Sequence, residues 1–188
     1  MSLKKFRNID LIILLIIAFI SEILGIRILD NVNFSFAPIV LLITIIRWKK
    51  ESIINIVLFP ILLFLVNIKY GLIENLLFSL KYLITYIIIY FIFRFKNNVD
   101  FYKKFTKISF YMIVIYIIMF LTQILLTIIF YGITSLKEFV IGYLFQDIIN
   151  LVFNLIFGLI ASSQQNFIID MNYYFTKVNK GRGIDDER

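Results

Sequence analysis

Six long apolar runs follow one another along the sequence, and they restrict its fold more than any other feature. A helix of about 20 apolar residues crosses the hydrocarbon core of a bilayer, which is about 30 Å thick. A lone strand cannot do so, because its backbone groups would stay without hydrogen bonds in lipid. The second run is short, about 22 Å as a helix, so it must stand nearly upright to cross. The sequence therefore predicts an all-α integral membrane bundle of six transmembrane helices, over residues 11–29, 34–48, 52–68, 72–95, 108–131 and 139–161.

The composition narrows the chemistry that the chain can perform. Its 188 residues are 61% hydrophobic, whereas about half is usual for a soluble domain. They include no Cys and no His, which excludes thiolate chemistry, disulfides, histidine acid–base catalysis and ordinary zinc or haem ligation. The sequence contains no P-loop or dinucleotide-binding motif, so the chain cannot energise transport by hydrolysing a nucleotide itself. We expect neither an enzyme nor a bound cofactor.

The positive charges predict the orientation in the membrane. With a cytoplasmic N-terminus, 15 of the 19 Lys and Arg residues fall on cytoplasmic segments and 3 on the opposite side, while Lys81 lies within a helix. Because cytoplasmic loops carry such an excess, we expect both termini in the cytoplasm and a multi-pass protein of the cytoplasmic (inner) membrane. The net charge of +7 thus indicates topology and not a nucleic-acid partner. We divide the chain into a membrane domain over residues 1–164 and a charged cytoplasmic tail over residues 165–188.

Polar side chains inside apolar helices cost free energy and are therefore informative. Counted from the predicted outer helix ends, Lys81, Gln123 and Asp147 lie at a similar depth of about 12–15 Å. Asp147, Asn150 and Asn154 are spaced by three and four residues, so they share one helix face. We expect these groups to form a pocket for an external polar solute, in which Lys81 neutralises an anionic group and two tyrosines stack on a ring. The inner half is expected to be almost purely apolar. The predicted substrate-binding residues are Lys81, Tyr82, Gln123, Tyr131, Asp147 and Asn150.

A structural interpretation of the same residues stays open. Lys81 and Asp147 can pair with each other, while the amides complete a network that holds the helices together, each bond contributing less than about 2 kcal/mol. We interpret Glu22 together with Arg27 as an interfacial pair and not as a ligand contact. The sequence therefore leaves a wet pocket and a dry network as alternatives.

Several short stretches carry a family resemblance: residues 17–19 (IAF), 37–42 (APIVLL), 80–83 (LKYL) and 123–131 (QILLTIIFY). In these stretches the chain resembles the substrate-binding S component of energy-coupling factor (ECF) vitamin transporters, and the thiamine-binding ThiT type most of all. The resemblance implies capture of a small water-soluble vitamin or related heterocycle from outside. It also implies partners, namely an ECF transmembrane T component and ATPase subunits. Lys81 stands where that type has a Glu that meets the cationic ligand, so a molecule other than thiamine is expected.

The same resemblance implies a docking surface on the first helix. S components meet their transmembrane partner through small residues spaced along that helix, a pattern that allows helices to approach closely. In this sequence the small residues that fit the pattern are Ala18, Ser21 and Gly25.

A second resemblance is to the rod-shape protein MreD family. It rests on residues 36–42 (FAPIVLL), where Pro38 opens a Leu-rich helix after a short linker. This resemblance implies a membrane scaffold of cell-wall elongation with no transported ligand, in which the polar residues only hold helices together.

Overall fold

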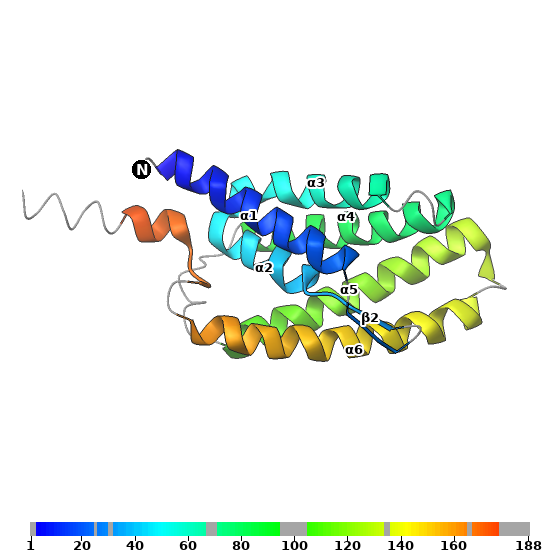
Figure 1. Ribbon diagram of the computed structural model, residues 1–188. Coiled ribbons are helices and arrows are strands. Elements are labelled where there is room, and N and C mark those ends of the chain that lie inside the picture. The colour runs from blue at the N-terminus through cyan, green and yellow to red at the C-terminus, as the bar shows by residue number, and fades with distance from the viewer. Residues whose placement is uncertain are drawn as a thin grey trace, which may run out of the picture.

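The computed structural model describes residues 3–24, 26–29, 32–66, 71–94, 105–133, 136–164 and 167–176. Helices lie side by side in one elongated bundle, and a short hairpin lies beside α6 (Figure 1). The predicted helical bundle is confirmed in this coarse form, and the hairpin is an addition to it. In chain order the elements are α1 (Leu3–Ile23), β1 (Ile26–Leu29), β2 (Val32–Phe34), α2 (Ala37–Trp48), the 3₁₀ helix η1 (Lys49–Ser52), α3 (Ile53–Val66), α4 (Leu72–Arg94), α5 (Phe105–Tyr131) and α6 (Leu136–Ser163).

Among the described residues, three helices are long and apolar enough to cross a membrane. The spans are Leu72–Phe93 in α4, Phe105–Tyr131 in α5 and Val140–Ser163 in α6. Large apolar side chains are also exposed on α1 and α3, for example Ile12 and Ile61. Soluble proteins seldom expose so much contiguous apolar surface, so the bundle is compatible with a multi-pass membrane protein.

The first predicted helix is wrong at both ends. Helix α1 begins at Leu3 and ends at Ile23, and residues 26–29, predicted as its last turn, form strand β1. Strand β1 pairs with β2 in antiparallel register, with Ile26 opposite Phe34. An apolar run cannot separate these outcomes by itself, because Ile and Leu suit both a helix in lipid and a buried strand.

Helix α2 lies inside the bundle, and all 12 of its residues are buried. At 1.5 Å per residue it is about 18 Å long, shorter than the run predicted over residues 34–48. The residues before Ala37 belong to the hairpin and its connection. The helix is therefore surrounded by protein, which accounts for the apolar residues on all its faces.

A buried helix needs partners for the amides of its first turn, since no water reaches them. The Ala37 amide donates to Ser35 Oγ at 3.0 Å, and the Ile39 amide donates to Asn154 Oδ1 on α6 at 3.0 Å. Between them stands Pro38, which has no N–H group to satisfy. The local sequence Ser-Phe-Ala-Pro thus provides one hydrogen-bond acceptor for the first turn of α2, and Asn154 of α6 provides another.

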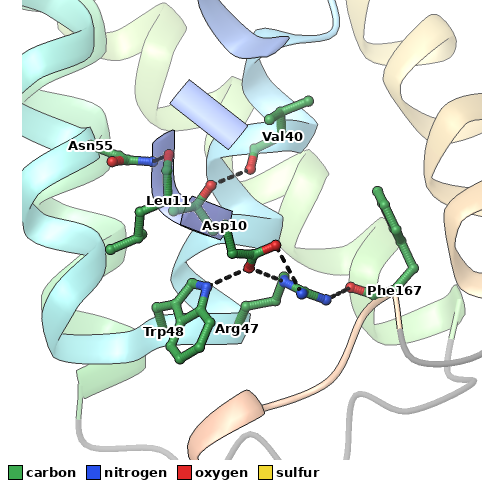
Figure 2. A network of polar contacts seen from close by, with 8 residues as sticks. Asp10, Leu11, Val40, Arg47, Trp48, Asn55 and Phe167 are labelled. Atoms are coloured by element: carbon green, nitrogen blue, oxygen red, sulfur yellow. Dashed lines mark hydrogen bonds and ion pairs between the residues drawn. The ribbon is translucent and has the colours of Figure 1, made fainter. Parts of the chain in front are cut away.

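A polar cluster joins the helices at the end of the bundle that carries the N-terminus (Figure 2). Asp10 of α1 accepts hydrogen bonds from Arg47 Nε at 2.9 Å and from Trp48 Nε1 at 2.6 Å, both at the end of α2. Arg47 Nη1 also donates to the carbonyl of Phe167 at 2.8 Å. This end of the bundle is therefore not purely apolar. A buried Arg is tolerated here because a carboxylate and a carbonyl satisfy it.

The first described part of the predicted tail packs onto the same end. The buried carboxylate of Asp170 lies 2.7 Å from Lys49 Nζ. The ring of Phe175 lies 5.5 Å from the ring of Phe6, centre to centre. Residues 167–176 are thus part of the folded unit and cover the cluster around Asp10 and Arg47.

Candidate functional site

A cavity of about 420 Å³ is lined by residues from the end of α1, the start of α2, and helices α4, α5 and α6. Figure 1 shows how these helices lie in the bundle. Small-molecule sites in proteins commonly measure about 300–1,000 Å³, so the space suits a ligand of one or two rings. Its lining residues are Glu22, Ser35, Pro38, Phe78, Lys81, Tyr82, Tyr116, Met119, Gly142, Tyr143, Gln146, Asp147 and Asn150.

Four of the six predicted substrate-binding residues line this cavity, namely Lys81, Tyr82, Asp147 and Asn150. The other two lie elsewhere. Gln123 is buried, and its Oε1 has no hydrogen-bond partner among the described residues. At the exposed end of α5, Tyr131 donates a hydrogen bond to Glu74 at 2.9 Å. Depth along a helix does not fix the direction in which a side chain points, which is why the two were grouped with the others.

Lys81 and Asp147 face each other from α4 and α6. The distance from Lys81 Nζ to Asp147 Oδ1 is 3.7 Å, and the two side chains are 5% and 9% exposed. The other oxygen, Asp147 Oδ2, is buried and accepts no hydrogen bond from the described residues. Lys81 Nζ also lies 5.4 Å from the ring centre of Phe78 and 5.8 Å from that of Tyr143. The two charges are matched, yet the cavity leaves room beside the pair.

Glu22 lines the cavity as well, although the sequence interpretation placed it at the interface with Arg27. Tyr82 Oη donates to Glu22 Oε2 at 2.8 Å, and Ser35 Oγ donates to the same oxygen. The Ser35 hydroxyl also accepts from the Ala37 amide, so its own proton is directed at Glu22. Both donors end on one oxygen, and no described residue donates to Glu22 Oε1. Two hydroxyl groups thus hold Glu22 Oε2 in place, and Glu22 Oε1 can still accept a hydrogen bond from a ligand.

Asn150 and Asn154 anchor the start of α2 to α6 beside the cavity. Asn150 Oδ1 accepts from the Ser35 amide at 2.9 Å. Asn154 Nδ2 donates to the Ser35 carbonyl at 2.7 Å and to Tyr116 Oη at 3.0 Å. The polar stripe predicted on this helix therefore has two roles: Asn150 borders the cavity, and Asn154 is a structural centre with no exposed surface.

Part of the remaining lining could have been found from the sequence. Tyr143 and Gln146 lie one turn before Asp147 and Asn150, on the same face of α6. Likewise Phe78 stands four residues before Tyr82 on α4. By contrast, Glu22, Ser35 and Tyr116 come from three separate elements, and only packing brings them to the cavity.

The predicted docking residues on α1 are placed differently from one another. Ala18 is fully buried in the core, so it cannot contact a partner in this packing. Ser21 is half-buried, and its hydroxyl donates to the Ala18 carbonyl at 2.8 Å. Gly25 lies outside the described residues. A docking face on α1 would thus have to exclude Ala18.

No group of three or more acidic, His or Cys side chains suited to a metal ion occurs in the part of the chain that the structure describes. The cavity offers groups for ionic, hydrogen-bonding and stacking contacts. One ammonium group, two carboxylates, several hydroxyl groups and four aromatic rings surround a space of ligand size.

Compared with known proteins, the chain matches no family model, and no significant similarity to a curated protein or to a solved structure was found. The resemblances to ECF S components and to MreD therefore rest on the short stretches quoted above. The functional assignment has to come from the cavity itself.

Proposed function

We propose that the protein is a membrane-embedded substrate-binding (S) subunit of an ECF-type ATP-driven importer. It would capture a small water-soluble vitamin or related heterocycle in the cavity between α1, α4, α5 and α6. The observation that supports this most is a hollow of ligand size, lined by Glu22, Lys81 and Asp147, inside a bundle with an apolar surface. Charged groups in lipid cost several kcal/mol unless they are paired or functional.

One unsatisfied polar atom of a cavity-lining residue supports a ligand over a closed network. Nearly all buried polar atoms in folded proteins have a hydrogen-bond partner, and an exception needs an explanation. Asp147 Oδ2 is such an exception next to the cavity. A hydrogen-bond donor on a bound solute would lie close to Asp147 and Glu22, where the protein has left acceptor capacity unused.

The arrangement in the membrane is part of the same proposal. All six α-helices would be embedded, both termini would face the cytoplasm, and the cavity would open to the outside of the cytoplasmic membrane. The excess of Lys and Arg on one set of segments supports this orientation. The T component and ATPase subunits would meet the cytoplasmic loops and the exposed face of α1 near Ser21, without Ala18.

A scaffold of the MreD kind is the alternative, and one observation favours it. Asn154 makes a complete set of contacts to Ser35, Ile39 and Tyr116 without any ligand. If every polar residue served such a purpose, the cavity would bind nothing specific. A binding experiment therefore separates the two functions.

The test is a thermal-shift screen of the purified full chain in nanodiscs against a panel of water-soluble vitamins and heterocycles. A ligand at 100 times its Kd stabilises the folded state by about 2.7 kcal/mol. Gly142 provides the matched variants, because it borders the cavity and a Cβ there meets nothing within 4 Å. We expect Gly142→Phe to fill the cavity and abolish the shift, and Gly142→Ala to retain it.

The outcomes distinguish the proposals clearly. A shift that Gly142→Phe removes and Gly142→Ala keeps supports solute capture in this cavity. A shift that survives Gly142→Phe places the ligand elsewhere. No shift with any member of the panel would leave the scaffold function.

A further inference from the structure

The ionisable groups of the cavity carry one more negative than positive charge. Among its described lining residues, Glu22 and Asp147 are acidic and Lys81 is the one basic side chain. Lys81 Nζ lies 3.7 Å from Asp147 Oδ1, so these two charges largely cancel. Glu22 forms no ion pair with a described residue. The charge that is left for a ligand is therefore that of Glu22.

Two neutral hydroxyl groups hold one oxygen of the Glu22 carboxylate. Both of its partners, Tyr82 and Ser35, are neutral hydroxyl groups that donate to Oε2. The Ser35 hydroxyl cannot reverse its direction easily, because its oxygen already accepts from the Ala37 amide. Donors that converge on a carboxylate oxygen stabilise the negative charge. They do not neutralise it, and Oε1 receives no donor from the described chain.

The aromatic rings that line the cavity also attract positive charge, and in the structure the cation beside them is Lys81. Lys81 Nζ lies 5.4 Å from the ring centre of Phe78 and 5.8 Å from that of Tyr143. Rings at this distance attract a cation through their quadrupole, and the attraction grows when water is excluded. Tyr82, whose hydroxyl reaches Glu22, packs its ring against Phe78 with centres 5.4 Å apart. The rings therefore extend from the Lys81 side of the cavity to the Glu22 side.

Asp147 contributes the unsatisfied acceptor that distinguishes this site from a mere acidic pair. Its side chain is more than nine-tenths buried, and Oδ2 has no hydrogen-bond partner among the described residues. A ligand with N–H groups could satisfy part of this acceptor capacity. An anionic ligand could not, because it would meet two carboxylates and a lysine that is already paired.

Building on the proposed function, we propose that the ligand is an organic monocation and that Glu22 determines this charge specificity. The positively charged nitrogen would lie beside Glu22 Oε1, between the rings of Phe78, Tyr82 and Tyr143. This assignment replaces the expectation that Lys81 neutralises an anionic ligand. In it, Lys81 balances Asp147 so that one net negative charge remains.

The experiment measures Kd by titration calorimetry with the full chain in nanodiscs, using ligands that differ only in charge. One set is 1-methylnicotinamide, nicotinamide and nicotinate, and a second is benzyltrimethylammonium, benzyl alcohol and benzoate. In each set we expect the cation to bind most tightly. Glu22→Gln should weaken cation binding by about 30-fold or more, the usual consequence of removing one partner of a buried charge pair. Binding of the neutral member should change by less than about threefold.

Glu74→Gln is the matched control. Glu74 is an exposed carboxylate near the same end of the bundle, outside the cavity, so this variant removes one negative charge without touching the site. We expect it to leave every Kd within about twofold, since exposed charges are screened by salt. Equal losses in Glu22→Gln and Glu74→Gln would overturn the assignment, because the effect would then be that of net charge.

The remaining outcomes separate this inference from the proposed function. Tighter binding of the neutral or anionic members would overturn the cation preference and leave solute capture standing. If neither set binds, the charge of any ligand found in the vitamin panel decides, and a neutral or anionic one refutes the inference. Binding of no compound at all would remove both proposals together.

Discussion

Replacement of Asn154 by Ala should be one of the most destabilising changes in the protein. Asn154 has no exposed surface and accepts from the Ile39 amide at 3.0 Å. It also donates to the Ser35 carbonyl at 2.7 Å and to Tyr116 Oη at 3.0 Å. The first two partners are backbone groups at the start of the buried helix α2, where water cannot replace the lost side chain.

The magnitude follows from the groups that the change leaves without a partner. A buried donor or acceptor with no partner costs about 1–3 kcal/mol. The Ile39 amide and the Ser35 carbonyl together give about 4 kcal/mol, and Tyr116, which borders the cavity, can recover its hydrogen bond with water. For a chain of this size, 1 kcal/mol shifts Tm by about 2–4 °C. We therefore expect Asn154→Ala to lower Tm by about 8–16 °C.

The assay is thermal unfolding in nanodiscs, followed by the fluorescence of Trp48, the single Trp of the chain and a fully buried one. Ser162→Ala is the control on the same helix. Its exposed hydroxyl donates only to the Leu159 carbonyl of its own helix, so the change should cost less than about 0.5 kcal/mol. A Tm for Asn154→Ala within about 2 °C of the unaltered protein would refute the reasoning that α6 supplies the cap of α2.

Two further predictions concern the buried charges. Asp10→Ala should cost about 3–5 kcal/mol, because it leaves Arg47 Nε and Trp48 Nε1 without their acceptor at the end of α2, and the measurement is the loss of Tm. Lys81→Met should cost a similar amount by leaving Asp147 uncompensated, whereas the double variant Lys81→Met, Asp147→Asn should recover most of it. A double-mutant cycle measures this coupling, and strictly additive losses would show that the two side chains do not interact.

The long apolar runs predicted the later helices closely. The runs over 52–68, 72–95, 108–131 and 139–161 correspond to α3, α4, α5 and α6, with each end displaced by at most three residues. Such runs are informative because a helix in lipid satisfies its own backbone, so composition and length settle the outcome together. The same rule is insufficient for α2, which is enclosed by protein, and for the hairpin β1–β2, where the backbone pairs between strands.

Only some residues of the candidate site could be predicted from the sequence, and the reason is physical. Lys81 and Asp147 could be found because a charge inside an apolar helix is conspicuous in the sequence. Glu22 was equally conspicuous, but its place near the end of an apolar run suggested an interface. In the structure Glu22 instead accepts hydrogen bonds from Tyr82 and Ser35, which are 60 and 13 residues away along the chain.

The sequence by itself determined that this chain forms a largely helical bundle suited to a membrane, and which helix faces carry polar groups. Both follow from local properties, the cost of unpaired backbone in lipid and the 3.6-residue period of a helix. Only the tertiary structure decided that α2 is buried, that Asn154 caps it and that Glu22 joins Lys81 and Asp147 around one cavity. Those facts depend on the directions in which side chains from different helices point. These directions become fixed relative to one another only when the helices pack.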